Sequence, residues 1–174
     1  MIIVGIDPGL SGGIAWYDSL CTGHKVGACK MPGTLRDIYG LLSGHTATVG
    51  IGHAEAFYMV EKVGTYMPGN SGPAAAKFAR HCGALDMALI AIGLPWDNIT
   101  PVKWQKEFIG APAWGPLPPV KTPERKRELA RRKQIRKNLI KEKAQRLYPH
   151  VKVTLATADA LGILTYAMNL KGAS

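Results

Sequence analysis

The first thirteen residues constrain the fold more than any other stretch of this chain. Large aliphatic residues fill four of the five positions from 2 to 6, which is typical of a strand buried on both faces. Asp7 follows, and Pro8 lacks the backbone N–H that further sheet pairing would need. Glycines at 9, 12 and 13 allow a tight reversal into the apolar run 14–17, which predicts an antiparallel partner strand. Asp7 is therefore expected at the end of a central strand, with a turn-capping aspartate as the alternative.

Length and composition indicate one folded domain. The chain has 174 residues, of which 47% are hydrophobic and 20% charged, values that exclude global disorder. No apolar run is long enough to span a membrane, and the N-terminus lacks the pattern of a signal peptide, so we expect a cytoplasmic protein. The three cysteines have no metal-ligand spacing and are expected to be reduced.

The net charge of +10 is concentrated in one segment. Between Lys121 and Arg146 there are twelve Lys or Arg and three Glu, a net +9, so the rest of the chain is almost neutral. Such a density of positive charge favours a polyanion, and binding to it should weaken steeply with salt. A solvated surface helix that only aids solubility is the alternative.

The apolar patterns predict strands that alternate with helices. The expected strands are 2–6, 14–17, 25–31, 57–60, a strand or turn at 95–100, and a short edge strand at 151–153. The expected helices are 34–42 with Thr34 as its cap, 74–92, a short helix from Pro101 that holds Trp104 and Phe108, the basic helix 123–147, and an apolar helix 160–170 opened by residues 157–159. Five prolines make 110–123 an irregular spacer.

Three carboxylates lie at predicted element ends in an otherwise acid-poor chain. Asp7 and Glu61 end strands, and Asp159 begins the last helix. Carboxylates brought together repel one another unless cations neutralise them, and their hard oxygens suit Mg²⁺ or Mn²⁺. Two such ions can activate water and stabilise the leaving oxygen in phosphodiester hydrolysis. Each acid also has an ordinary interpretation, because Glu61 can pair with Lys62, and Asp159 can complement a helix dipole.

Four motifs, in order, resemble those of the RuvC-type Holliday junction resolvases of the ribonuclease H-like superfamily, in particular the phage and organellar branch. They cover most of the chain: Gly5-Ile6-Asp7-Pro8-Gly9, Val60-Glu61-Lys62-Val63 followed by Met67-Pro68-Gly69, Pro101-Val102-Lys103-Trp104-Gln105-Lys106, and Ala158-Asp159-Ala160-Leu161. The first motif alone also resembles sugar kinases, whereas the four together are more specific.

The resemblance implies an α/β fold with a mixed five-stranded sheet flanked by helices, as a single domain over 1–174. It implies a homodimer, in a bacterial or phage-infected cell, that nicks four-way DNA junctions symmetrically. It also implies two Mg²⁺ or Mn²⁺ ions held by Asp7, Glu61 and Asp159. The small-residue helix 74–92 is the expected dimer surface. The DNA contacts we predict are Tyr66, Met67, Lys103, Trp104, Lys126, Arg127, Arg131, Arg132, Lys133, Arg136 and Lys137.

Two positions depart from the family pattern. Bacterial members carry another acid three residues before the last one, where this chain has Ala156. A junction-binding protein with weakened or lost catalysis is therefore an alternative function. Glu55 lies in a context similar to that of Glu61, although the spacing to Met67-Pro68-Gly69 favours Glu61. A phosphotransferase related to sugar kinases would need a second similar domain, for which the chain has no room.

Overall fold

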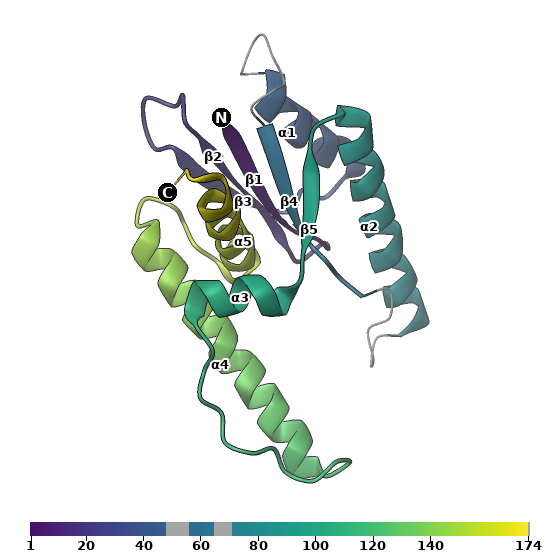
Figure 1. Cartoon of the computed structure of the whole chain (residues 1–174). Coiled ribbons are helices and arrows are strands. Elements are labelled where there is room, and N and C mark those ends of the chain that lie inside the picture. The colour runs from purple at the N-terminus through teal and green to yellow at the C-terminus, as the bar shows by residue number, and fades with distance from the viewer. Residues whose placement is uncertain (48–55, 65–70, 174) are drawn as a thin grey trace.

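The computed structural model describes residues 1–47, 56–64 and 71–173 and shows one five-stranded sheet in the order β3-β2-β1-β4-β5 (Figure 1). The strands are β1 (Ile2–Asp7), β2 (Gly13–Asp18), β3 (Val26–Lys30), β4 (Ala56–Glu61) and β5 (Trp96–Ile99). β2 pairs antiparallel with β1 and β3, whereas β4 pairs parallel with β1 and β5. The predicted mixed α/β sheet is confirmed.

Helices cover both faces of this sheet (Figure 1). The chain forms α1 (Leu35–Ala47), α2 (Gly72–Ile92), α3 (Pro101–Ile109), α4 (Pro123–Leu147) and α5 (Leu155–Lys171). One core joins the sheet to α1 and α2, and a second joins it to α3, α4 and α5. None of the helices within the described residues is long and apolar enough to cross a membrane.

The central strand β1 contributes to both cores by alternation. Ile2, Val4 and Ile6 belong to the core under α1 and α2, and Ile3 belongs to the core under α5. Gly5 also faces α5, because a Cβ at this position would clash with the backbone of Leu164. The absence of a side chain at Gly5 therefore lets the middle of α5, at Ala160 and Leu164, approach β1 closely.

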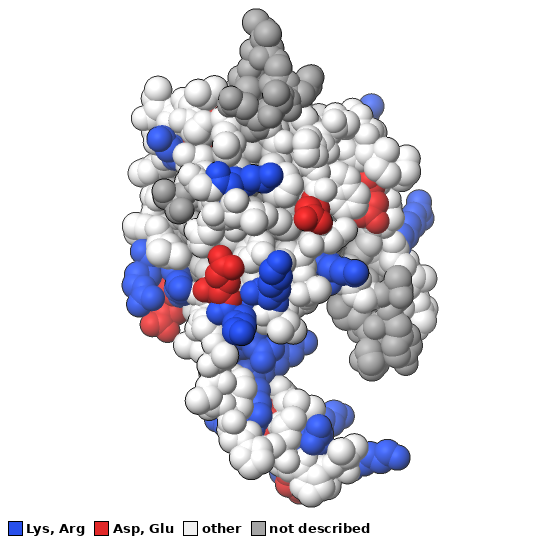
Figure 2. Space-filling model, viewed as in Figure 1, with Lys and Arg blue, Asp and Glu red and all other residues white. Residues whose placement is uncertain are grey.

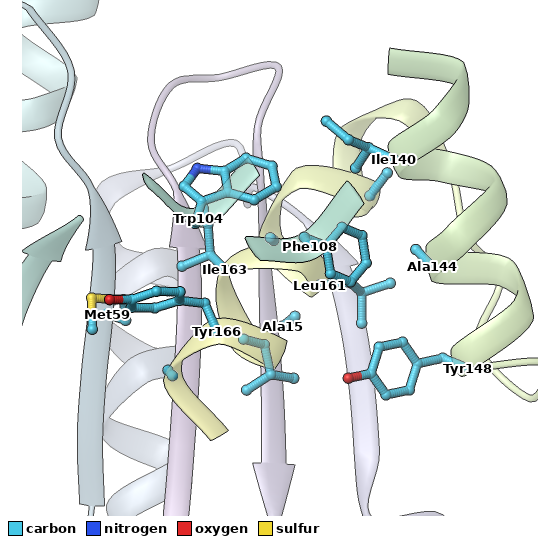
Figure 3. Packing of buried hydrophobic residues seen from close by; sticks show 14 of the residues in the cluster. Ala15, Met59, Trp104, Phe108, Ile140, Ala144, Tyr148, Leu161, Ile163 and Tyr166 are labelled. Atoms are coloured by element: carbon cyan, nitrogen blue, oxygen red, sulfur yellow. The ribbon is translucent and has the colours of Figure 1, made fainter. Parts of the chain in front are cut away.

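The second core locks α3 between α5 and α4. Trp104 and Phe108, one turn apart on α3, are buried, and their rings lie 6.4 Å apart. Figure 3 shows Phe108 close to Leu161 of α5, with Ile140 of α4 on its other side. These contacts hold the C-terminal half of α4 to the domain.

Most predicted boundaries agree with the structure, including both ends of α4. The last helix begins at Leu155, before the predicted opening at 157, because Thr154 caps it and forms a capping box with Thr157. The predicted edge strand at 151–153 is wrong. Val153 is buried in the second core without pairing with the sheet, so its apolar character reflects packing.

Candidate active site

Two of the three predicted acids meet because β1 and β4 are parallel neighbours. Ile6 pairs with Val60, so the next residue on each strand, Asp7 and Glu61, ends its strand at the same edge of the sheet. Strand alternation also gives both the same face, since Gly5 and Met59, two residues earlier, face the core under α5. Both carboxylates are thereby directed toward α5.

The third acid comes from the start of α5. The turn of α5 around Ala156 lies against Gly13, which pairs with Asp7, because a Cβ at position 13 would clash with the main-chain oxygen of Ala156. Asp159 lies on the next turn and interacts electrostatically with Asp7 and Glu61. It lies beyond the first turn of α5, which holds no acid, so the dipole at the helix end does not explain its presence.

A glycine turn keeps the space around Asp7 free. A side chain at Gly12 would clash with the main-chain oxygen of Asp7, and its Cβ would lie 3.1 Å from the carboxyl carbon. The N–H of Gly12 donates to the carbonyl of Gly9, which has a φ of 109°, a conformation that favours glycine. The predicted reversal after Pro8 therefore also determines access to the carboxylate.

Trp104 supports Glu61 from inside the domain. Its indole Nε1–H donates a hydrogen bond of 2.8 Å to Oε1 of Glu61, and its side chain is 0% exposed. The prediction that Trp104 contacts DNA is therefore wrong. The spacing of Trp104 and Phe108, one helical turn apart on α3, was the signal for burial.

The three acids are half-buried, and their surroundings disfavour the charged forms. Burial, together with the charges of Glu61 and Asp159, raises the pKa of Asp7 to about 8. Burial also raises the pKa of Glu61 and of Asp159, against the lowering effect of the Trp104 hydrogen bond on Glu61. Lys137 of α4 lowers the pKa of both Asp7 and Asp159, so it provides part of the missing positive charge.

This donor set fits a hard divalent cation. Three carboxylates with raised pKa values lack sufficient counter-charge, and carboxylate oxygens are the ligands that Mg²⁺ and Mn²⁺ prefer. Among the described residues, no three His, Cys, Asp or Glu side chains already have the arrangement of a metal site. The acids are thus electrostatic neighbours whose side chains must turn toward one point to share an ion.

The basic helix begins outside the domain and runs toward the acids. Only Ile140 and Ala144 of α4 are buried, and its N-terminal half extends away from the sheet (Figure 1). Lys and Arg side chains follow this extension in Figure 2. Of the predicted DNA contacts on α4, Lys126, Arg127, Arg131 and Lys133 are exposed, and Arg136 and Lys137 are half-buried. Arg136 and Lys137 line a groove that also contains Glu61 and Asp159.

Two other residues predicted to contact DNA, Arg132 and Lys103, make interactions within the protein instead. Arg132 bonds within the protein, where its Nε donates 2.7 Å to Glu128 and its Nη2 donates 2.6 Å to the carbonyl of Gly115. Lys103 lies over the ring of Tyr166, with its Nζ 5.7 Å from the ring centre, and is not among the groove residues. Tyr66, Met67 and Glu55 lie outside the described residues, so their predicted roles stay predictions.

Comparison with solved structures identifies the architecture. Thermus thermophilus RuvC matches 99% of this chain and 98% of its own length, with a TM-score of 0.53 and 16% identity. T. thermophilus RuvC in complex with a Holliday junction substrate matches with a TM-score of 0.54 and 17% identity, covering 99% and 97% of the two chains. This chain has a RuvC-like, ribonuclease H-like fold. No family model and no curated protein matches the sequence.

The sequence did not indicate two of the residues that line the groove, nor the effect of Lys137 on the acids. Lys137, which stays a predicted contact to DNA, has a second effect that the sequence did not indicate, because its charge lowers the pKa of Asp7 and Asp159. Gln105 and Trp114 were not predicted as site residues, although both line the groove beside Glu61. The aromatic side chain of Trp114 in a proline-rich spacer was the one available signal, because a spacer needs no large ring.

Proposed function

We propose that this protein is a metal-dependent DNA endonuclease that resolves four-way junctions. The observation that supports this most is a set of three half-buried, electrostatically coupled carboxylates, two of which line a groove together with cations of a strongly basic helix. A site for an isolated metal ion would not need that helix, and a binding surface for nucleic acid would not need half-buried acids. The RuvC-like fold and the resemblance to the phage and organellar branch favour branched DNA as the substrate.

In this proposal Asp7, Glu61 and Asp159 hold Mg²⁺ or Mn²⁺, two ions per active site. Bound there, the ions would activate water as the nucleophile and would stabilise negative charge on the leaving oxygen. Trp104 orients Glu61 through its hydrogen bond, and Lys137 lowers the cost of ionising Asp7 and Asp159. The exposed cations of α4 hold DNA through its phosphates without reading sequence.

Symmetrical cleavage needs two active sites on one junction, so we propose a homodimer in the cytoplasm. The outer face of α2 is the proposed interface. Met87 and Ile90 on this helix are 60% and 61% exposed, and an apolar surface of that kind is typical of a protein contact. Sedimentation of the purified protein tests this, with Met87→Glu expected to yield monomers.

Ala156 favours a second candidate function, a junction-binding protein with weakened or lost catalysis. Its main chain lies against Gly13 beside Asp7, so the position of the missing acid is part of the site. With one carboxylate fewer, the affinity for a second cation should be lower.

One experiment separates the two functions. A labelled four-way junction is incubated with the protein and Mg²⁺, with EDTA in place of Mg²⁺, and beside linear duplex of the same sequence. Paired nicks that need Mg²⁺ and the junction support the nuclease. Tight junction binding without nicks supports the binding protein, and Ala156→Asp then shows whether the missing acid alone is responsible.

A further inference from the structure

The groove beside the acids is lined by the basic helix α4 and also by the segment that connects α3 to α4. Its volume is about 480 Å³, within the range of about 300 to 1,000 Å³ typical of ligand sites. Glu61 and Asp159 lie in its lining, and Arg136 and Lys137 line it from α4. Trp114 also lines it, from the proline-rich segment 110–122 that connects α3 to α4 and contains neither helix nor strand.

Hydrogen bonds from α4 hold this segment in place. Nη2 of Arg132 donates to the carbonyl of Gly115, and Nη1 of Arg125 donates 2.8 Å to the carbonyl of Pro118. The guanidinium of Arg132 also lies over the ring of Trp114, 5.4 Å from its centre. Only 13% of the Arg132 side chain is exposed, so this arginine positions Trp114 and is not a surface charge for phosphates.

Trp114 itself is not core. It is half-buried, whereas Trp104 is fully buried, and Trp114 belongs to neither hydrophobic core. A positioned aromatic ring that lines a groove beside cations and catalytic acids matches the chemistry of a nucleotide. The ring can stack on a base while the cations neutralise its phosphate.

We infer that Trp114 stacks on the base of a nucleotide next to the phosphodiester that is cut, and that Arg132 is the positioning residue for its ring. This inference rests on the proposed nuclease function and adds a base subsite to it. Stacking on one base holds the scissile phosphate at a defined distance from the acids. Because every base has a π-face, the subsite should affect cleavage of all sequences.

The test combines a protein change with a substrate change. Cleavage sites of the wild-type protein are mapped, and junctions are made with an abasic nucleotide at each of three positions on either side of the cut. Trp114→Ala should slow cleavage of the intact junction roughly tenfold, as expected for the loss of one base stack. At one abasic position the wild-type protein should lose the same factor, and Trp114→Ala should lose nothing further.

Two further variants make the result specific. Trp114→Phe keeps an aromatic ring and should retain most of the activity. Arg132→Lys keeps the charge but not the forked hydrogen bonds, so it should cleave the intact junction more slowly than the wild-type protein does. On the same abasic junction the two proteins should cleave at equal rates. Thermal melting of each variant checks that the domain is folded.

The outcomes separate this inference from the proposed function. If Trp114→Ala is folded and its loss of cleavage rate multiplies with the loss caused by the abasic nucleotide at all six positions, the two changes are independent. Trp114 then only stabilises the protein, and the inference is wrong. If the wild-type protein does not cut any junction with Mg²⁺, the proposed function fails first and the base subsite fails with it. Equal loss at one abasic position, without further loss in the variant, establishes the subsite.

Discussion

Asp7 at the sheet edge and Glu128 on the outer part of α4 have pKa values shifted in opposite directions. Burial and neighbouring carboxylates raise the pKa of Asp7 to about 8, whereas hydrogen bonds from Arg131 and Arg132 lower the pKa of Glu128 to about 2. Asp7 has too little positive charge nearby to balance it, whereas Glu128 has an excess. A half-buried carboxylate with little positive charge nearby is suited to bind a cation, and an excess of arginine and lysine is suited to bind phosphates.

The two regions also differ in what holds them. The sheet edge is defined by backbone pairing and by the close approach of α5 at Gly5. The outer half of α4 contacts mainly the proline-rich segment 110–122, through Arg125 and Arg132. We therefore expect substitutions at the edge to affect chemistry and stability, and substitutions on outer α4 to affect DNA affinity and its salt dependence.

The sharpest test of this division is Asp7→Asn. Removing one charged ligand should lower the cleavage rate by at least about a thousandfold while junction affinity stays within about twofold. Rates are measured on a labelled junction and affinities by gel shift in Ca²⁺. Asp18→Asn is the matched control, because Asp18 ends β2 at the opposite edge of the sheet, paired with Ile2. Full cleavage by Asp7→Asn would remove Asp7 from the mechanism.

The pH dependence of the free energy of unfolding should distinguish Asp7 from Glu128. In metal-free protein, folded Asp7 keeps a proton that the unfolded chain releases near pH 4. The free energy of unfolding should therefore be greatest below about pH 4 and fall as the pH rises toward 8. Glu61 and Asp159, whose pKa values are also raised, contribute to the same decline. Asp7→Asn removes only the contribution of Asp7, so at pH 8 in EDTA the variant should be more stable than wild type by about 2 to 4 kcal/mol.

Urea denaturation at pH 5.5 and pH 8 measures this difference. Glu128→Gln is the control from α4, since the lowered pKa of Glu128 places its titration below this range. An Asp7→Asn variant with the same decline as wild type would show that Asp7 is ionised without cost.

Trp104→Phe tests the hydrogen bond between buried Trp104 and Glu61 at the sheet edge. The variant keeps an aromatic ring but loses the N–H that bonds Glu61, and since that bond lowers the pKa of Glu61, the pKa should rise. Cleavage should fall about 10- to 100-fold, the usual effect of losing a partner of a metal ligand, and the activity profile should shift to higher pH. Phe108→Leu, on the same face of α3, is the control for packing alone, and an equal pH shift in that variant would contradict the role of the hydrogen bond.

The smallest effect is expected from outer α4. Replacing Lys126 and Lys133 by Ala should weaken junction binding about tenfold at moderate salt and reduce the slope of log affinity against log salt by about two. The cleavage rate at saturating protein should not change. The double variant of Lys25 and Arg36, two basic residues of the near-neutral remainder of the chain, is the control. An unchanged salt slope would indicate that α4 does not contact phosphates.

Much of the fold was accessible from local sequence patterns. The hairpin at residues 2–17, the strand that ends at Glu61 and both ends of α4 follow from apolar runs, glycines, prolines and helix-forming composition. The start of α5 was misplaced because the capping box of Thr154 and Thr157 was overlooked, and 151–153 was misassigned because an apolar residue in a connection can pack without pairing.

The sequence by itself determined the elements of this protein and the acids at or near their ends, because these depend on interactions between neighbours along the chain. Only the tertiary structure decided that Asp7 and Glu61 share a face, that Trp104 bonds Glu61, and that Lys137 lies beside the acids. These relations depend on strand register and on the rotation of α3, α4 and α5 about their axes. Both are set by packing between residues far apart in sequence, which no local pattern specifies.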